Sequence, residues 1–398
     1  MDRIALRVAS EVRTMTRLEV VGLILKGRLT MIQGASILGL GARQLRRLRE
    51  KYEIFGKEAL FDGRRGLSRK RRIPDETMDE ICRLKRDVYP DFSMKHFFEK
   101  VTEKHHLKVS YTFTRELLQL RGLAQKLTAR GKYRRKRERR PLIGMLVHND
   151  ASTHEWIVGL PKQDLVVSLD DADGKMLFAR FFEQEGTHST LVSLEHVLRV
   201  HGRFGEFYTD RGSHFCRTEK AGGAPDLVQN GQVARVLKTI GIRHILARSP
   251  EARGRGERCF GTIQGRLPQE LRLHAIKSYV AANLYLEEQF LPDFNRRFTV
   301  SPTERGTAFT RMPGIDLDLL VSEHHDRIVA NDNTVSFGNV ALQLPQMRTR
   351  IHLARCPVTV HELLDGTLAV TFSGVLVGHF ERKGGLLQRG ALSKAKAA

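Results

Sequence analysis

The sequence predicts a multidomain protein of α plus α/β plus β class, with helical units first, a mixed sheet next and short strands at the end. Its length of 398 residues predicts two to four domains at roughly 100–200 residues each. Helical periodicity fills residues 1–127, strands and helices alternate over residues 142–312, and short strand patterns follow. With 41% hydrophobic residues, these segments have enough apolar side chains to bury several cores.

Charge separates the first third of the chain from the rest. The formal net charge is +22. Residues 1–140 hold 36 Lys and Arg against 17 Asp and Glu, whereas residues 141–398 hold 31 against 28. The cationic surface therefore belongs to the N-terminal third, and a polyanion is the expected partner.

Composition also excludes several classes of protein. No stretch approaches the roughly 20 consecutive apolar residues of a membrane span, so we expect a soluble protein with no membrane partner. Residues 1–10 lack the features of a secretory signal. The cysteines are widely spaced without a CxxC pair, which argues against a disulfide framework or a cysteine zinc site and favours a reducing cytoplasm. They are Cys82, Cys216, Cys259 and Cys356.

Residues 1–60 are predicted to form a helix-turn-helix DNA-binding domain. Helical patterns cover residues 17–26, 31–38 and 42–53, with Thr30 as a possible N-cap and a glycine-containing turn over residues 38–41. The last helix keeps leucines on one face and basic or polar side chains on the other, which is typical of a major-groove reader. The alternative is a helical hairpin with a solvated basic face. The candidate DNA-contacting residues are Arg43, Gln44, Arg46 and Arg47.

A basic linker over residues 61–73 leads to a second helix-turn-helix-like domain over residues 74–127. The linker is rich in glycine and arginine, so we expect it to lie along a phosphate backbone or in a minor groove. Its candidate contacts are Arg64, Arg65, Arg69 and Lys70. In the second domain the third helix, residues 110–120, opens with the candidate base-reading residues Tyr111, Thr112, Thr114 and Arg115. Its histidines are not interpreted as a zinc site, because no cysteine stands at a compatible spacing.

A second basic linker, residues 128–141, separates the helical part from the strands. We expect it to contact phosphates, since neutralising phosphates is what a dense run of Lys and Arg does best. A solvated tether without a partner is the alternative. The candidate contacts are Lys132, Arg134, Arg135 and Arg137.

Residues 142–312 are predicted to form the catalytic core. Strand patterns occur at 142–148, 165–169, 176–182, 206–209 and 242–246, and helical patterns at 187–201, at 232–240 and from 256 onward. The first three strands follow one another closely and predict an antiparallel meander. The order β-β-β-α-β-α-β-α describes a ribonuclease-H-like mixed sheet.

Three carboxylates fall at informative places in this core. Asp150 ends the first strand, Asp210 ends the fourth, and Glu257 lies in the first turn of the late helix. Neighbouring strand ends and a facing helix would bring three hard oxygen donors together, which suits two Mg²⁺ or Mn²⁺ ions about 3.5–4 Å apart. Asp170 and Asp171 are the nearest rivals as ligands, but a hairpin turn explains both without chemistry.

Four motifs then arrive in the order of a known family, at residues 149–156, 169–174, 208–213 and 247–258. Together they resemble a DDE transposase of the retroviral-integrase superfamily, closest to the ISNCY insertion-sequence group. The resemblance implies catalytic and metal-binding roles for Asp150, Asp210 and Glu257. It also implies binding of terminal inverted repeats, cleavage of DNA 3′ ends and strand transfer into target DNA. The implied partner is double-stranded DNA, bound by a homo-oligomer in the cytoplasm of a bacterium, at the nucleoid.

The chain departs from the family pattern near the third carboxylate. Gly256 replaces a bulkier residue, and glycine within a helix predicts a loose helix start. Arginine replaces lysine at position 253, and residues 213–228 are interpreted as an inserted loop. Arg253, Arg255 and Arg258 surround Glu257 and are candidates for holding DNA phosphates, with a solvated basic helix start as the alternative.

Two other functions stay open at this point. A DNA-binding regulator descended from a transposase would keep the helix-turn-helix units without chemistry, and Gly256 is its only support. A ribonuclease-H-like nuclease would cut DNA without strand transfer.

The C-terminal part is predicted to be a small β-barrel over residues 313–381, with a DNA-backbone or subunit contact as its task. Residues 382–398 are predicted to be a disordered tail.

Overall fold

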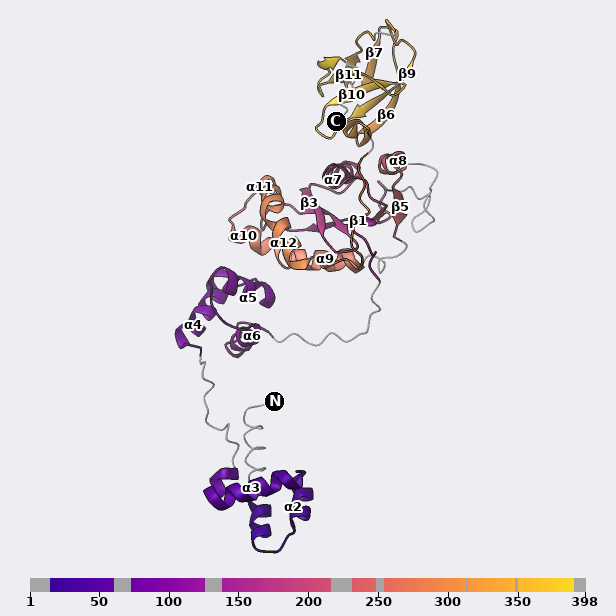
Figure 1. The fold of residues 1–398 in the computed structure, drawn as a ribbon. Helices are drawn as coiled ribbons and strands as arrows, with labels where there is room; N and C mark the ends of the chain where they lie inside the picture. The colour runs from indigo at the N-terminus through magenta and orange to yellow at the C-terminus, as the bar shows by residue number, and fades with distance from the viewer. Residues whose placement is uncertain are drawn as a thin grey trace. The chain divides into compact units, whose positions relative to one another are not determined.

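The computed structural model describes residues 15–60, 73–125, 138–215, 231–247, 254–312, 314–347 and 350–389 (Figure 1). The chain divides into two compact units, Met1–Cys82 and Arg83–Ala398. Within the described part, no helix is both long and apolar enough to cross a membrane.

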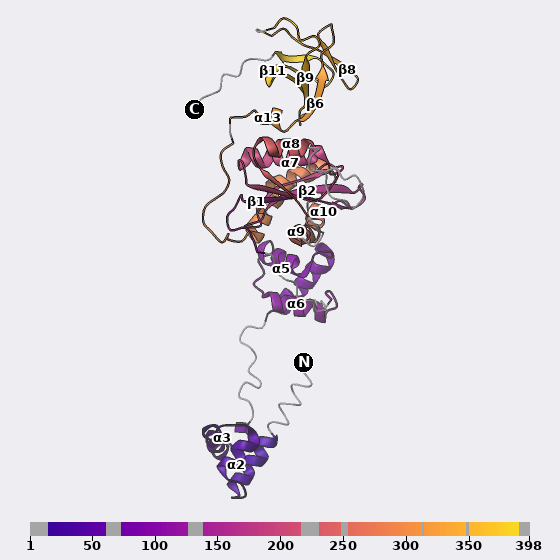
Figure 2. The same cartoon turned by 90° about the vertical axis from the view of Figure 1, so that its right-hand side faces the viewer.

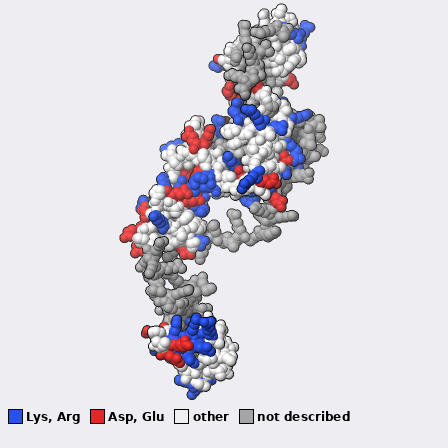
Figure 3. Space-filling model, in the orientation of Figure 1, with Lys and Arg blue, Asp and Glu red and all other residues white. Residues whose placement is uncertain are grey.

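The N-terminal unit is helical, as predicted. Residues 15–25 form a helix, followed by α2 (Met31–Leu38), α3 (Ala42–Phe55) and a 3₁₀ turn, η1 (Gly56–Leu60). Thr30 caps α2 through a reciprocal capping box with Gln33, and Gly39 ends α2 in the left-handed conformation, with φ 62°. Val21, Ala35, Leu45 and Leu60 form the buried core. Figure 3 shows Lys and Arg side chains gathered on part of this unit.

The second helical segment contains three helices, as predicted. α4 (Asp75–Arg83) continues as a π-helical turn, η2 (Leu84–Val88), and is followed by α5 (Met94–Glu103) and α6 (Tyr111–Leu120). Serine side chains cap the last two, because Ser93 accepts from the backbone N–H of His96 and Ser110 accepts from that of Phe113.

The core is built on a five-stranded mixed sheet. Its strands are β1 (Leu146–His154), β2 (Gln163–Asp170), β3 (Met176–Phe182), β4 (Glu206–Thr209) and β5 (Arg243–Leu246), in the order β3-β2-β1-β4-β5. β1, β2 and β3 pair antiparallel, whereas β4 pairs parallel with both β1 and β5. The predicted antiparallel meander of the first three strands and the predicted neighbourhood of the first and fourth strands are confirmed.

Helices cover both faces of this sheet (Figure 2). α7 (Thr187–Val200) and α8 (Gln232–Thr239) pack on one face. The other face is covered by α9 (Gly254–Gln264), α10 (Leu267–Leu273), α11 (Tyr279–Tyr285), a π-helical turn η4 (Leu286–Phe290) and α12 (Leu291–Phe298). Val166 joins the first core and its neighbours Leu165 and Val167 join the second, as the two-residue period of a strand requires.

The C-terminal part follows a short helix, α13 (Leu317–Leu320). One sheet has the strand order β12-β11-β10-β9-β6, and β7 and β8 form a separate pair. The described strands therefore form open sheets, in which β6 and β12 each have one neighbour, and the predicted small β-barrel is not confirmed. The strands are β6 (Glu323–Ile328), β7 (Thr334–Phe337), β8 (Val340–Gln343), β9 (Pro357–Glu362), β10 (Leu368–Phe372), β11 (Val375–Phe380) and β12 (Leu386–Arg389).

The prediction of a disordered tail from residue 382 is also corrected. Residues 386–389 form β12, which pairs antiparallel with β11. A turn at Gly384, with φ 94°, returns the chain toward β11, and the backbone N–H of Glu381 donates to the carbonyl of Gly385 at 2.7 Å. Residues 390–398 lie outside the described part.

Candidate active site

Asp150 lies in the middle of β1, not at its end as predicted, because the strand extends to His154. Asp210, the second candidate carboxylate, directly follows β4. In the parallel register His148 lies opposite Tyr208. Asp150 and Asp210 each follow two residues later, so the same register continued would set them at one level on neighbouring strands. Asp150 is half-buried, and its Oδ1 accepts a hydrogen bond from the backbone N–H of Ala151 at 2.8 Å.

Helix α9 carries the third carboxylate and lies directly against β1. A Cβ atom placed on Gly256 would be 2.7 Å from the Oδ2 of Asp150, so only glycine allows this approach without a shift. Further along the helix, the Gln264 amide donates to the hydroxyl of Ser152 at 3.0 Å. Gly256 is thus explained by packing, and the regulator hypothesis loses its only sequence support.

Asp150 and Glu257 line one cavity of about 370 Å³ between β1 and α9. Glu257 is exposed to solvent there. Carboxylate oxygens are the ligand type that Mg²⁺ and Mn²⁺ prefer. Among the described residues, however, no three His, Cys, Asp or Glu side chains gather closely enough to hold a metal ion. The structure brings two of the three predicted residues together, and Asp210 does not line their cavity.

Asp210 has an acidic neighbour that sequence reasoning missed. Its Oδ1 accepts from the backbone N–H of Gly212 at 2.8 Å. Burial, and then the negative charges of Asp210 and Asp164, raise the pKa of Glu185 to about 7. The ring of His214 lies 3.8 Å from the Glu185 carboxylate, and burial lowers the pKa of this histidine. Glu185 stands just before α7, where the sequence gives no motif to single it out.

Asp171 is the centre of a second buried cluster. Its side chain is 1% exposed and accepts from His148 Nε2 at 2.7 Å and from the backbone N–H of Arg140 at 2.8 Å. Arg255, in the first turn of α9, forms an ion pair with the same carboxylate and donates to the Asp171 carbonyl at 2.8 Å. The prediction that Arg255 holds DNA phosphate is therefore wrong in this structure, since its guanidinium is 10% exposed and engaged by Asp171.

The hairpin explanation holds for Asp170. Its carboxylate accepts from the backbone N–H groups of Gly144 at 2.6 Å and Ala172 at 2.8 Å, as a turn-forming aspartate does. Burial raises the pKa of Asp170 to about 6 despite those bonds. For Asp171 the hairpin explanation is incomplete. The sequence signal for its further role is that the turn needs only one acidic residue, whereas two are present.

The predicted DNA-reading residues of α3 are all exposed, as such a role requires. These are Arg43, Gln44, Arg46 and Arg47. On α6, Thr112 and Arg115 are exposed, as is Arg258 on α9. Thr114 is fully buried and bonds the carbonyl of Ser110, so its prediction as a base-reading residue is wrong. Tyr111 is half-buried and packs edge-on against Phe98, 5.5 Å between ring centroids.

The remaining basic candidates lie outside the described residues. They are Arg64, Arg65, Arg69 and Lys70 of the first linker, Lys132, Arg134, Arg135 and Arg137 of the second, and Arg253.

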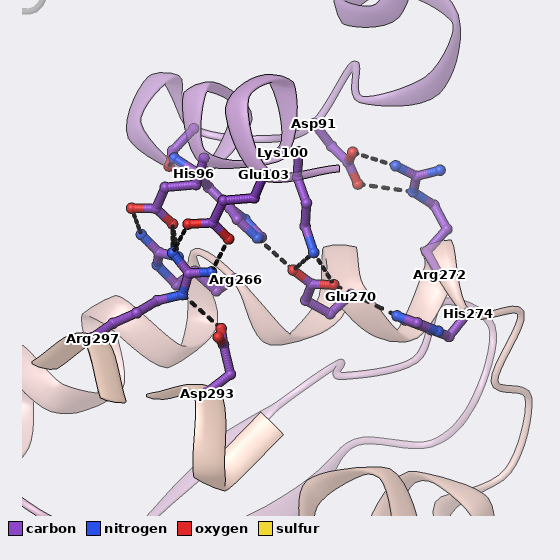
Figure 4. A network of polar contacts seen from close by, with 12 residues as sticks. Asp91, His96, Lys100, Glu103, Arg266, Glu270, Arg272, His274, Asp293 and Arg297 are labelled. Carbon is purple, nitrogen blue, oxygen red and sulfur yellow. Dashed lines mark hydrogen bonds and ion pairs between the residues drawn. The ribbon is translucent and has the colours of Figure 1, made fainter. Parts of the chain in front are cut away.

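An ion-pair network joins α5 to α10 and α12 (Figure 4). The largest cluster surrounds Glu270, which bonds His96 Nε2 and Lys100 Nζ, each at 2.6 Å. α5 and α6 lie in the same compact unit as the core, Arg83–Ala398, and this network joins α5 to it. The other pairs are Arg272 with Asp91, Arg266 with Glu99, and Arg297 with Glu103, Glu99 and Asp293.

Comparison with known proteins decides the family. Residues 16–69 match the model of a helix-turn-helix domain. Over 373 residues, 92% of this chain, the sequence is 32% identical to the Sinorhizobium fredii protein named "Putative transposase y4bF", and the match covers 80% of that protein. The chain belongs to the transposases. A second relative, the transposase for insertion sequence IS1202 of Streptococcus pneumoniae, is 26% identical, over 80% of this chain and 76% of the relative.

The transposase core also matches solved integrases at low similarity. The match to the HTLV-2 integrase catalytic core, solved in complex with magnesium, covers 36% of this chain and 82% of the integrase chain, with 19% identity and a TM-score of 0.28. The match to a chain of a simian T-cell lymphotropic virus intasome covers 74% of this chain and 99% of the intasome chain, with 15% identity and a TM-score of 0.34.

Proposed function

We propose that this transposase binds the terminal inverted repeats of its element, cleaves the DNA 3′ ends and joins them to target DNA. Water attacks the phosphodiester in the first step, and the freed 3′-hydroxyl attacks target DNA in the second. Asp150, Asp210 and Glu257 serve both steps.

The packing of Gly256 on Asp150 is the observation that carries this proposal. It allows the first turn of α9 to lie against the middle of β1, and Glu257 lines the same cavity as Asp150. Two Mg²⁺ or Mn²⁺ ions held by the three carboxylates would lower the charge on the phosphate and help to ionise the attacking hydroxyl. The chain's own contribution is to hold two of these oxygen donors on rigid elements, a central strand and a helix that packs on it.

End recognition is assigned to the helix-turn-helix unit. The exposed Arg43, Arg46 and Arg47 follow one another on α3, and Gln44 can bond a base edge in the major groove. We also assign Thr112 and Arg115 of α6 to DNA. Because two ends must be joined, we expect a homo-oligomer on DNA, acting at the bacterial nucleoid.

The proposal is tested with labelled DNA from the ends of the element, incubated with Mg²⁺ and the full chain. Asp150→Asn, Asp210→Asn and Glu257→Gln should each abolish cleavage and joining while end binding persists. Glu287→Gln, which removes an exposed carboxylate of η4, is the control and should behave as the wild type.

The same assay separates the other functions. End binding without cleavage by the wild type, in either Mg²⁺ or Mn²⁺, would contradict the proposal and support a regulator. Cleavage without any joining would support a nuclease.

A further inference from the structure

We propose that Asp171 is a positioning residue that sets Glu257 against Asp150 by clamping the first turn of α9 to the sheet. This inference rests on the proposed function, because it concerns the same site. Asp171 itself touches no reacting atom in this account. It acts through Arg255 and His148.

Asp171 is placed to connect the two parts of the site. It directly follows β2, and its backbone N–H donates to the carbonyl of Leu146 on β1 at 3.0 Å. Through His148 its carboxylate also holds β1 two residues before Asp150. Through Arg255 it holds α9 two residues before Glu257. One buried carboxylate therefore contacts both elements that line the cavity.

The contact with Arg255 fixes orientation as well as distance. Its Nη1 forms an ion pair with the carboxylate and also donates to the Asp171 backbone carbonyl, so two acceptors of one residue hold the same nitrogen. Both groups are buried, with exposures of 1% and 10%. A buried charge is stable only when it is paired, which makes the alternative positions of Arg255 unfavourable.

The backbone at the start of α9 needs a restraint from a side-chain contact of this kind. Two of its first three residues are Gly254 and Gly256, which give the backbone more freedom than other residues would. The Cβ of a residue in place of Gly256 would stand 2.7 Å from the Oδ2 of Asp150, so either that side chain or the helix would have to shift. Arg255, between the two glycines, supplies the restraint through its side chain.

The test compares the wild type with Asp171→Asn, Arg255→Gln and the double variant. Asn keeps the shape and an acceptor but removes the charge. The control is Arg266→Gln, which removes a guanidinium of equal exposure, 10%, from the buried pair with Glu99. The readouts are Mn²⁺ affinity by titration calorimetry, the Mn²⁺ dependence of end cleavage, end binding and the melting temperature.

A positioning role predicts a specific pattern. Asp171→Asn and Arg255→Gln should each weaken Mn²⁺ binding and raise the Mn²⁺ requirement of cleavage by about 10–100-fold, the usual effect of removing a group that orients ligands. End binding should not change. The double variant should be no worse than either single one, since both remove the same contact. Arg266→Gln should lower the melting temperature without changing the Mn²⁺ requirement.

The contrary outcomes are distinct. If the single variants melt earlier but cleave at the wild-type Mn²⁺ concentration, Asp171 is structural only and the inference is wrong while the proposed function stands. If Asp171→Asn does not fold, Arg255→Gln alone decides between these outcomes. If the wild type binds ends but never cleaves them, the proposed function fails, and unchanged Mn²⁺ affinity in the variants would then overturn the inference as well.

Discussion

A methyl group on the Cα of Gly256 would stand 2.7 Å from the Oδ2 oxygen of Asp150. The residue that weakened the family pattern in the sequence is therefore the one that lets α9 reach β1. Glycine lowers the stability of the helix, but it allows the helix to approach the strand closely.

Gly256→Ala should consequently destabilise the fold and abolish end cleavage. The added carbon must push α9 or Asp150 aside, at a cost of about 1–3 kcal/mol in the free energy of unfolding. Gly261→Ala is the matched control on the same helix, because a Cβ there meets no atom within 4 Å. It should raise the free energy of unfolding by about 0.5–1 kcal/mol through better helix propensity. Urea unfolding of both variants measures the difference, and equal effects would show that the contact does not matter.

The network between α5 and the core predicts different roles for two adjacent arginines. Arg297 is 16% exposed and pairs with Glu103, Glu99 and Asp293, whereas Arg296 is 63% exposed and pairs with Asp293. Arg297→Ala should cost about 1–2 kcal/mol, because it removes one partner of Glu99, which is 12% exposed, whereas Glu103 and Asp293 are 48% and 46% exposed and stay solvated. Arg296→Ala should cost about 0–1 kcal/mol. Chemical denaturation distinguishes them, and similar losses would argue against the network as a fixed interface.

Glu270 makes the stability of this interface depend on pH. Burial disfavours its charged form, but hydrogen bonds from His96 and Lys100 and the charge of Lys100 outweigh burial and lower the pKa of Glu270 to about 2. Burial also lowers the pKa of His96, so its neutral ring donates through Nε2–H.

A carboxylate with a lowered pKa stabilises the fold fully above its ordinary pKa of 4.5, and the contribution is lost as the pH falls toward 2. Its size is about 3 kcal/mol at neutral pH. The stability difference between wild type and Glu270→Gln should therefore be constant from pH 8 to about pH 5 and shrink below that. Unfolding curves at several pH values measure it, and a difference that grows toward low pH would contradict the assigned ion pair.

Local signals in the sequence predicted most of the fold. The Thr30 cap and the Gly39 turn both follow from short-range chemistry. The face of a helix that is buried was harder to predict. Thr114 lies in the first turn of α6, but its side chain is buried. Sheet closure and the β12 strand depend on pairing between segments, which the strand patterns of single segments do not specify.

The sequence singles out the candidate carboxylates of the site, but not the residues that hold their strand and helix in position. The sequence around Asp171 predicts only a hairpin turn. In the structure Asp171 pairs with Arg255, which lies 84 residues later in the chain. No short-range pattern connects the two residues. For the same reason Arg255 was assigned to DNA, since a basic run at a helix start is usually exposed.

The proposed function requires Asp210 to act together with Asp150 and Glu257, although Asp210 does not line the cavity that those two residues share. The decisive measurement incubates labelled element ends with Mg²⁺ and either the wild type or Asp210→Asn, and follows end binding, cleavage and joining in the same reaction. We expect the wild type to cut and join the ends and Asp210→Asn to bind them equally well without cutting. Cleavage by Asp210→Asn at the wild-type rate would contradict the account.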